Sequence, residues 1–549
     1  MTYVLLPGQY KALRKGPRRL KGARSLKVAL PGHNVTALFA PRVPLPPLTV
    51  MVDHSLERQA AEDDRLAYLL SLLAPAVPLD ADTPVVSRFW YADGGPPPHL
   101  PRIREPSTSW TVVPGWVTVD KWPADDGRGS IRYTVGEGSV SGSAIHMIGC
   151  LRAVQEEVAA DSHAVLPGDV ASRYADLVAA FAAKALGAHI YITDREYLFT
   201  TSLPTPRETV VMRPADALGV IGLYLRQQGH FFTDQLPDGG AVFHIHRGDF
   251  FWVAAHQLLP SIWRWRVAAQ QYADATNDPS LLELVSTLVY RLSNALQARD
   301  RLHAALYREQ DDDSADDVQD GLDQITLVLM AAFDIAARIT HEVYRLPKKP
   351  WPAWKDPGWL KGLNNTVLAG VFLGSNAHSD AATPADSLLM MIAEMRNVIH
   401  GSLPEPVRLH EQRRSPDTLL GLPRPTEKTE KVLRAMDRLG GRDLWGVEGF
   451  EEDEQGDIPG TFIRPAPFVE RLLPAAIHLL NQLLDAINVD LLEGVSLQPA
   501  DSAPPLESRS PFYNGTAERF LWQLALRPPG GGSLAPDGLV VTKENENDG

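Results

Sequence analysis

The sequence predicts an α/β domain with a mostly parallel sheet, followed by an all-α helical bundle. Up to about residue 245, short apolar runs of strand length alternate with amphipathic stretches, a rhythm typical of α/β folds. From about residue 247 onward, long stretches with helical periodicity follow one another. We therefore predict an α/β domain over residues 1–245, a helical domain over residues 246–494 and a mobile tail, rich in Pro, Gly, Ser and Asp, over residues 495–549.

The first predicted strand is the apolar run LTVMVD at residues 48–53, which ends in Asp53. The amphipathic stretch at residues 55–74 predicts a helix directly after it. Residues 76–150 are rich in Pro, Gly, Trp and Thr and contain alternating apolar and polar positions, which predict short strands. We interpret this segment as a strand-rich insertion into the α/β domain.

Residues 169–199 contain the clearest helix–strand unit. An Ala-rich helix is predicted to end at Gly187, because glycine readily adopts the left-handed conformation found after helix ends. The apolar run AHIYIT at residues 188–193 then predicts a buried strand, and residues 214–229 predict a further helix.

The C-terminal half is predicted to be built from long helices, with loop and hairpin excursions at residues 402–426 and 443–467. The acidic segment EQDDDSADD, residues 309–317, is predicted as a loop between two of them. The predicted helices span residues 249–274, 279–309, 315–346, 357–373, 384–402 and 467–490.

Composition limits the function classes. The net charge of −14 argues against a protein that coats nucleic acid along its whole surface. Residues 1–52 nevertheless contain no Asp or Glu and many Lys and Arg, so they are either a solvated basic arm or an arm that follows phosphates. The single cysteine, Cys150, fits a reducing compartment, and no stretch has the pattern of a signal peptide or a membrane span, so we expect a cytoplasmic protein with no membrane partner.

One predicted helix carries a polar motif near its end. Thr383 is placed to cap the helix, and Asp386 falls near the positive end of the helix dipole. Arg396 and His400 are four residues apart, so both side chains project from one face, and Asn397 begins the adjacent face.

These three side chains could cleave RNA without a metal. The imidazole of His400 could take a proton from a 2′-hydroxyl or give one to the leaving oxygen, while the Arg396 guanidinium stabilises charge on the phosphate. Asn397 could orient either partner. The alternative is that Arg396 and His400 pair with carboxylates or carbonyls and simply fix the end of the helix.

The segment EMRNVIHGSL resembles the signature of the HEPN superfamily, in which an Arg and a polar residue are followed by a His. The resemblance implies a helical bundle, a metal-independent ribonuclease site made of Arg396, Asn397 and His400, and a homodimer that joins two motifs in one site. The spacing between Arg396 and His400 is one residue shorter than the family's usual minimum, which leaves a binding-only descendant as an alternative.

Three aspartates of the N-terminal half form a second candidate site. Asp53 and Asp194 each end a predicted strand, and Asp176 lies on the Ala-rich helix. Strand ends of a parallel sheet meet at one edge, where clustered carboxylates are the ligands that hard divalent cations prefer. The segment ADLVAAFAAKALGAHIYITDREYL is similar to the closing part of PIN-like nuclease domains, and this resemblance implies Mg²⁺ or Mn²⁺ bound by Asp53, Asp176 and Asp194.

The sequence therefore predicts an endoribonuclease of a toxin, abortive-infection or antiphage defence type, with RNA as substrate and a defence-system protein as an expected further partner. No cofactor is expected at the HEPN-like site. A non-catalytic RNA- or nucleotide-binding regulator and a structural partner-binding protein remain open as alternatives.

Overall fold

A computed structural model gives the fold of the chain as two compact units, residues Met1–Phe243 and His244–Gly549. The basic arm, the predicted helix at 357–373 and most of the predicted tail lie outside the described residues. No helix of the described part is long and apolar enough to cross a membrane. The structure describes residues 47–73, 86–91, 115–121, 128–135, 138–146, 150–161, 165–203, 209–235, 242–308, 311–345, 383–401, 405–409, 417–422, 427–450, 460–498 and 516–524.

The N-terminal unit is built on a seven-stranded sheet of order β5-β4-β3-β2-β1-β6-β7. Along the sheet, the strands β3, β2, β1, β6 and β7 pair in parallel, whereas β4 and β5 extend the sheet beyond β3 in antiparallel fashion. The predicted mostly parallel sheet is therefore confirmed. The strands are β1 (Leu48–Asp53), β2 (Val86–Tyr91), β3 (Gly115–Lys121), β4 (Arg128–Val135), β5 (Gly138–His146), β6 (Ile190–Ile192) and β7 (Val210–Met212).

The segment 76–150, interpreted from the sequence as an insertion, is part of this main sheet. It supplies β2, β3, β4 and β5, and β2 pairs with the central strand β1 over its whole length, from Leu48↔Val86 to Asp53↔Tyr91. The interpretation as an insertion was wrong. The Pro- and Gly-rich composition of the segment gave no indication that its strands pair with the central strand of the main sheet.

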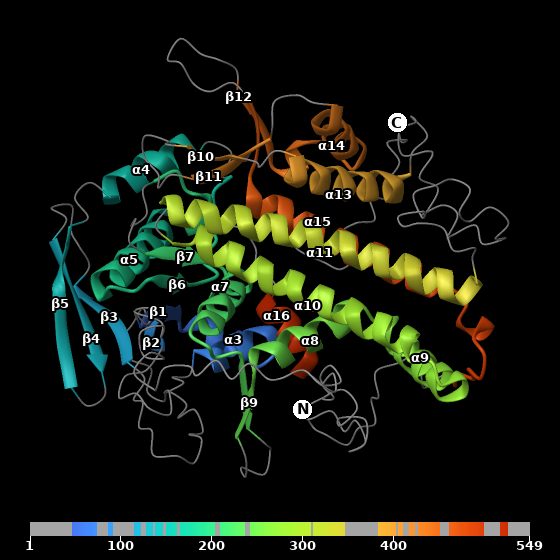
Figure 1. Cartoon of the computed structure of the whole chain (residues 1–549). Helices are drawn as coiled ribbons and strands as arrows, with labels where there is room; N and C mark the ends of the chain where they lie inside the picture. The colour runs from blue at the N-terminus through green and yellow to red at the C-terminus, as the bar shows by residue number, and fades with distance from the viewer. Residues whose placement is uncertain are drawn as a thin grey trace, which may run out of the picture. The chain divides into compact units, whose positions relative to one another are not determined.

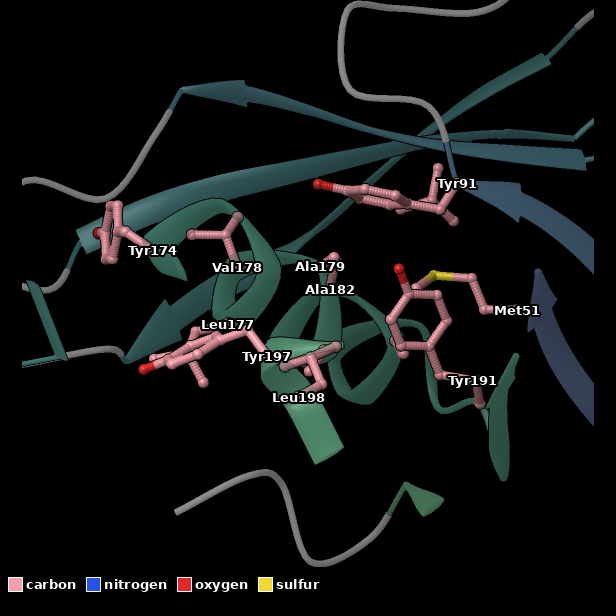
Figure 2. Packing of buried hydrophobic residues seen from close by; sticks show 14 of the residues in the cluster. Met51, Tyr91, Tyr174, Leu177, Val178, Ala179, Ala182, Tyr191, Tyr197 and Leu198 are labelled. Atoms are coloured by element: carbon pink, nitrogen blue, oxygen red, sulfur yellow. The ribbon is translucent and has the colours of Figure 1, made fainter. Parts of the chain in front are cut away.

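One face of the sheet is covered by α5 (Val170–Leu186), with α4 (Cys150–Ala160) packed beside it. Figure 2 shows side chains of the sheet, among them Met51, Tyr91 and Tyr191, gathered around the Ala-rich face of α5. Small alanines let the helix approach the sheet closely, so the three larger side chains fill the layer between them. Alternation along β1 directs Val50 and Val52 to the other face.

Helix ends in this unit follow the capping residues. Asp169 accepts a hydrogen bond from the amide of Ser172 at the start of α5, and Gly187 ends the helix with φ 75°, which confirms the predicted C-cap. The predicted helix at 55–74 is instead two helices, α2 (Ser55–Gln59) and α3 (Asp64–Leu72). Asp63 separates them, because its side chain caps the second one through the amides of residues 65 and 66. The unit also contains α6 (Tyr197–Thr200) and α7 (Pro214–Gln227).

The C-terminal unit is mainly helical, with α10 and α11 running side by side over most of their length (Figure 1). Its helices are α8 (Arg247–Leu258), α9 (Ile262–Thr276), α10 (Ser280–Leu306), α11 (Asp312–Tyr344), α13 (Pro384–Gly401), α14 (Glu427–Arg438), α15 (Pro465–Ala486) and α16 (Thr516–Leu524). The predicted helix 249–274 is divided at Pro260, which lacks the amide hydrogen that a continuous helix needs.

Two further expectations about this unit require correction. The unit is not all-α, because it carries a four-stranded sheet of order β10-β11-β13-β12, formed by Glu405–Leu409, Asp417–Gly421, Gly460–Ile463 and Val447–Phe450. Its two antiparallel pairs, β10-β11 and β12-β13, lie in the two segments expected as hairpin excursions, and β11 and β13 join them into one sheet. The acidic segment predicted as a loop is largely the first turns of α11. There the side chain of Asp311 and the hydroxyl of Ser314 cap each other's backbone amides, and the following aspartates lie at the positive end of the helix dipole.

The segment predicted as a mobile tail contains a packed helix. The ring of Phe520 in α16 lies 4.7 Å from that of Phe250 in α8. The carbonyl of Leu524 accepts a hydrogen bond from the buried guanidinium of Arg299. Both contacts come from residues far apart in the sequence, so local composition could not indicate them.

A buried histidine in this unit leads to a prediction about stability and pH. The ring of His256 lies between Trp252 and Trp263 and accepts a hydrogen bond from Arg266, while its Nδ1 faces the carbonyl of Trp252 at 2.8 Å. Burial, and then the positive charge of Arg266, lower the pKa of His256 to about 3. Folding therefore keeps this ring neutral at pH values at which the unfolded chain protonates it.

We expect the free energy of unfolding to fall as the pH drops below about 6.5, because the unfolded state takes up a proton at His256 that the folded state excludes until about pH 3. This group contributes a decrease of up to ~1.4 kcal/mol per pH unit. The free energy of unfolding, measured by urea denaturation at several pH values between 6 and 4, should therefore change less with pH in His256→Gln than in wild type. The exposed His478→Gln is the matched control and should keep the wild-type slope. Equal slopes in wild type and His256→Gln would contradict the assignment.

Candidate functional site

The order of the strands identifies one edge of the N-terminal sheet as a place for a site. From the central strand β1 the chain moves to β2 and β3 on one side, and later to β6 and β7 on the other. In open α/β sheets, ligands bind outside the carboxyl ends of the strands at the point where the direction of winding reverses. Here that point lies between β1 and β6, and the residues at their carboxyl ends are Asp53 and the segment 193–195.

Asp53 is a buried carboxylate with only 3% of its surface exposed. Its Oδ2 accepts hydrogen bonds from the Tyr191 hydroxyl at 3.0 Å and the Thr193 hydroxyl at 3.2 Å, and from Arg195 Nε at 2.5 Å. Its Oδ1 accepts from the amide and the hydroxyl of Ser55. Burial alone would raise the pKa of Asp53, but the Arg195 charge and these hydrogen bonds outweigh it and hold the pKa below its usual value. The carboxylate is therefore ionised and surrounded by donors.

Arg195 joins two of the three predicted metal ligands. Its Nε contacts Asp53, and its Nη1 contacts Asp176 Oδ1 on α5 at 2.8 Å. The guanidinium also lies 5.5 Å from the centre of the Tyr91 ring, within range of a cation–π contact. Asp194 lies next to this arrangement in the chain, but its Oδ2 accepts a hydrogen bond from Gln59 of α2 at 2.5 Å.

Of the three predicted metal ligands, Asp53 and Asp176 both form ion pairs with Arg195, whereas Asp194 accepts a hydrogen bond from the side-chain amide of Gln59. Within the described ranges, no group of three or more His, Cys, Asp or Glu side chains is arranged to hold a metal ion. Arg195 was not among the predicted site residues, although it directly follows Asp194 in ITDREYL. A basic residue beside a predicted acidic cluster was the available indication.

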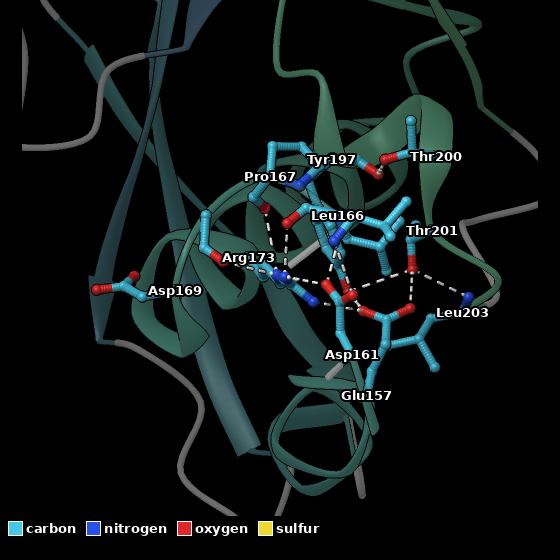
Figure 3. A network of polar contacts seen from close by, with 12 residues as sticks. Glu157, Asp161, Leu166, Pro167, Asp169, Arg173, Tyr197, Thr200, Thr201 and Leu203 are labelled. Carbon is cyan, nitrogen blue, oxygen red and sulfur yellow. Dashed lines mark hydrogen bonds and ion pairs between the residues drawn. The ribbon is translucent and has the colours of Figure 1, made fainter. Parts of the chain in front are cut away.

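A second polar network fixes α5 and α6 and so supports this edge (Figure 3). Arg173 of α5 is almost fully buried and contacts Asp161 at 2.9 Å and the carbonyls of residues 166–168. Glu157 of α4 accepts hydrogen bonds from the hydroxyls of Tyr197 and Thr201, at 2.6 Å and 2.8 Å. Burial, followed by the hydrogen bond to Glu157, raises the pKa of Tyr197 to about 12. Because Tyr197 is only two residues from Arg195, the network holds the segment that carries the guanidinium.

Arg396, Asn397 and His400 belong to α13, whose predicted start is confirmed. Thr383 and Asp386 cap each other: the amide and hydroxyl of Thr383 donate to Asp386 Oδ2, and the amide of Asp386 donates to the Thr383 hydroxyl. The buried face packs against α11 and α14. It includes Leu388, Met391, Ile392, Met395 and Val398.

Arg396 and Asn397 are half-buried on the last turns of α13. Asn397 Nδ2 donates to Glu394 Oε2 at 3.2 Å. Within the part of the chain that the structure describes, Arg396 forms no hydrogen bond or ion pair. The backbone of His400 belongs to the same helix, one turn further along, whereas its side chain lies outside the described residues.

A second Arg/His pair with the same spacing provides an internal comparison. Arg299 and His303 of α10 are both buried, and both contact Glu470 of α15, with Arg299 Nη2 at 2.6 Å and His303 Nε2 at 2.7 Å from its carboxylate oxygens. This pair is saturated by a carboxylate, as expected for a structural role. The spacing along the helix does not distinguish the two Arg/His pairs, because what sets the Arg299/His303 pair apart is the carboxylate of Glu470 on α15.

The N-terminal unit thus contains a guanidinium that bridges two carboxylates, and the C-terminal unit carries the half-buried Arg396 and Asn397 on the last turns of α13. Comparison with known proteins found no matching family model, no similar curated protein and no similar solved structure.

Proposed function

We propose that the protein is a metal-independent endoribonuclease of a toxin, abortive-infection or antiphage defence type, with Arg396, Asn397 and His400 as its catalytic residues. The observation that carries the proposal is the contrast between two Arg/His pairs of equal spacing. Arg299 and His303 are buried on Glu470. Arg396 is half-exposed and, within the described residues, has no counter-ion, so its guanidinium is available to bind a phosphate by donating hydrogen bonds to it.

The proposed chemistry needs one base, one acid and one cation. His400 takes the proton of the 2′-hydroxyl, the 2′-oxygen attacks the phosphorus, and the bond to the 5′-oxygen breaks. The leaving oxygen receives a proton, and the products carry a 2′,3′-cyclic phosphate and a 5′-hydroxyl. Arg396 stabilises the charge that grows on the phosphate oxygens. Two His400 side chains, one from each protomer of a homodimer, would supply the base and the acid together.

A finer description of the fold belongs to the same proposal: a PIN-like N-terminal domain and a HEPN-like C-terminal domain in a cytoplasmic homodimer that acts on RNA. The mostly parallel sheet, with Asp53 and Asp176 near the carboxyl ends of its central strands, supports the first assignment, and the motif near the end of α13 supports the second. In this scheme the N-terminal domain selects the target, and a defence-system protein is a candidate partner.

Incubation of the purified protein with total RNA, with and without EDTA, tests the proposal. We expect equal rates of cleavage in both conditions and fragments that end in 2′,3′-cyclic phosphate, because no step of the proposed reaction uses a metal. Cleavage that stops in EDTA and returns with Mg²⁺ or Mn²⁺ would overturn it.

The short spacing between Arg396 and His400, together with the hydrogen bond from Asn397 to Glu394, favours a second candidate: a non-catalytic RNA- or nucleotide-binding regulator. RNA bound in a mobility-shift assay but left intact over hours would support this alternative and exclude the nuclease.

A further inference from the structure

The resemblance to PIN-like domains implies a divalent metal at the edge between β1 and β6, and the contacts there do not fit one. A Mg²⁺ or Mn²⁺ site needs carboxylate oxygens that are directed at one point and open to the ion. Asp53 and Asp176 do approach each other, but Arg195 lies between them, in contact with both.

The lone pairs of Asp53 are committed to donors from the protein. Both of its oxygens accept, and two of the donors, the Ser55 amide and Arg195 Nε, cannot turn into acceptors or withdraw by rotation of a hydroxyl. An ion bound by Asp53 would have to displace the guanidinium from a carboxylate that is 3% exposed.

Asp194, the third predicted ligand, is held elsewhere. Gln59 Nε2 of α2 donates to Asp194 Oδ2, so this carboxylate is oriented by an amide, whereas Asp53 and Asp176 both contact Arg195. This neutral amide donor holds Asp194 in its present position without any cation.

Arg195 is itself held firmly in place. Its own amide donates to the Thr193 hydroxyl at 3.2 Å, its guanidinium lies over the Tyr91 ring, and its side chain is mostly buried. A guanidinium is charged at neutral pH, so Arg195 places a positive charge between the two carboxylates.

We infer that Arg195 is the built-in counter-ion of Asp53 and Asp176, that it stands in the place of the divalent metal, and that the N-terminal domain therefore binds no Mg²⁺ or Mn²⁺ at this edge. The carboxylates stabilise the carboxyl end of the sheet rather than activate water. The inference is independent of RNA cleavage by the C-terminal unit, because its readout is metal binding.

Titration of the full-length protein with MnCl₂ by calorimetry, together with thermal melting, tests this assignment. For both wild type and Asp53→Asn, MnCl₂ should give no heat of binding and should leave the melting temperature of each protein unchanged. Arg195→Gln removes the charge and leaves two facing carboxylates, so it should melt at a lower temperature than wild type and be stabilised by millimolar MnCl₂ by roughly 5 °C or more. Arg195→Lys keeps the charge and should respond less to Mn²⁺ than Arg195→Gln.

Two results would overturn the inference. One is a heat of Mn²⁺ binding in wild type that disappears in Asp53→Asn, since the site would then take a metal with Arg195 present. The other is a folded Arg195→Gln that melts as wild type does and ignores Mn²⁺, since Arg195 would then neutralise nothing. If Arg195→Gln does not fold without metal, the comparison of wild type with Asp53→Asn decides alone.

Discussion

Replacing His400 by alanine is expected to lower the rate of RNA cleavage by roughly 10²–10⁴-fold, because the reaction loses its proton acceptor. Arg396→Ala should lower it by about 10²–10³-fold, because the growing charge on the phosphate loses its stabilising cation. Arg396 is half-buried and lies between the buried residues Met395 and Val398, so truncating it leaves the buried face of α13 intact. Initial rates on a labelled RNA, measured in EDTA, check the two values.

A matched control is Arg434→Ala on α14. Arg434 is exposed and forms an i,i+4 ion pair with Glu430 at 3.6 Å, so its removal should leave both cleavage and melting temperature unchanged. Wild-type rates in both His400→Ala and Arg396→Ala would show that α13 does not carry the chemistry. Loss of cleavage accompanied by loss of folding would be distinguished by the melting curves.

Replacing Glu470 by alanine is expected to reduce the free energy of unfolding by about 3–5 kcal/mol, because it leaves a buried guanidinium without its counter-ion. Arg299 is 5% exposed and Glu470 6%, and two short contacts join their charged groups. His303 adds a third contact to the same carboxylate. Urea denaturation at pH 7 measures the change.

The pH dependence of the same network has a definite sign. Burial raises the pKa of Glu470, but Arg299 and His303 more than offset it, so the pKa in the folded protein is lowered. Its stabilising effect is thus fully present above the ordinary pKa of a glutamate and is lost as the pH falls through the folded value. The exposed Glu430→Ala is the matched control and should change the stability by less than about 0.5 kcal/mol at pH 7. A Glu470→Ala protein as stable as this control would contradict the assignment.

The features that could be predicted from the sequence are those whose determining interactions are local. The cap formed by Thr383 and Asp386, the glycine end of α5 at Gly187 and the strand that ends in Asp53 each depend on residues within one turn or one short run. Periodicity and capping preferences therefore sufficed to predict them.

Contacts between residues distant along the chain could not be predicted in this way. Arg195 contacts Asp53 across 142 residues, and Arg299 contacts Glu470 across 171. No local pattern distinguishes an arginine that neutralises two buried carboxylates from one on a solvated loop. For the same reason the sequence indicated three clustered aspartates but not the guanidinium that joins two of them.

The position of β1 in the sheet has a consequence for synthesis of the chain on the ribosome. β1 lies between β2 and β6, and its contacts with the region of β6 span about 140 residues, as in the hydrogen bond from the Thr49 amide to His189. At translation rates of about 5–20 residues per second, β1 waits roughly 7–28 s for this second neighbour after it has emerged. Through that interval one edge of an apolar central strand is unpaired and Asp53 lacks Arg195, so the nascent N-terminal unit is open to chaperones until β6 arrives.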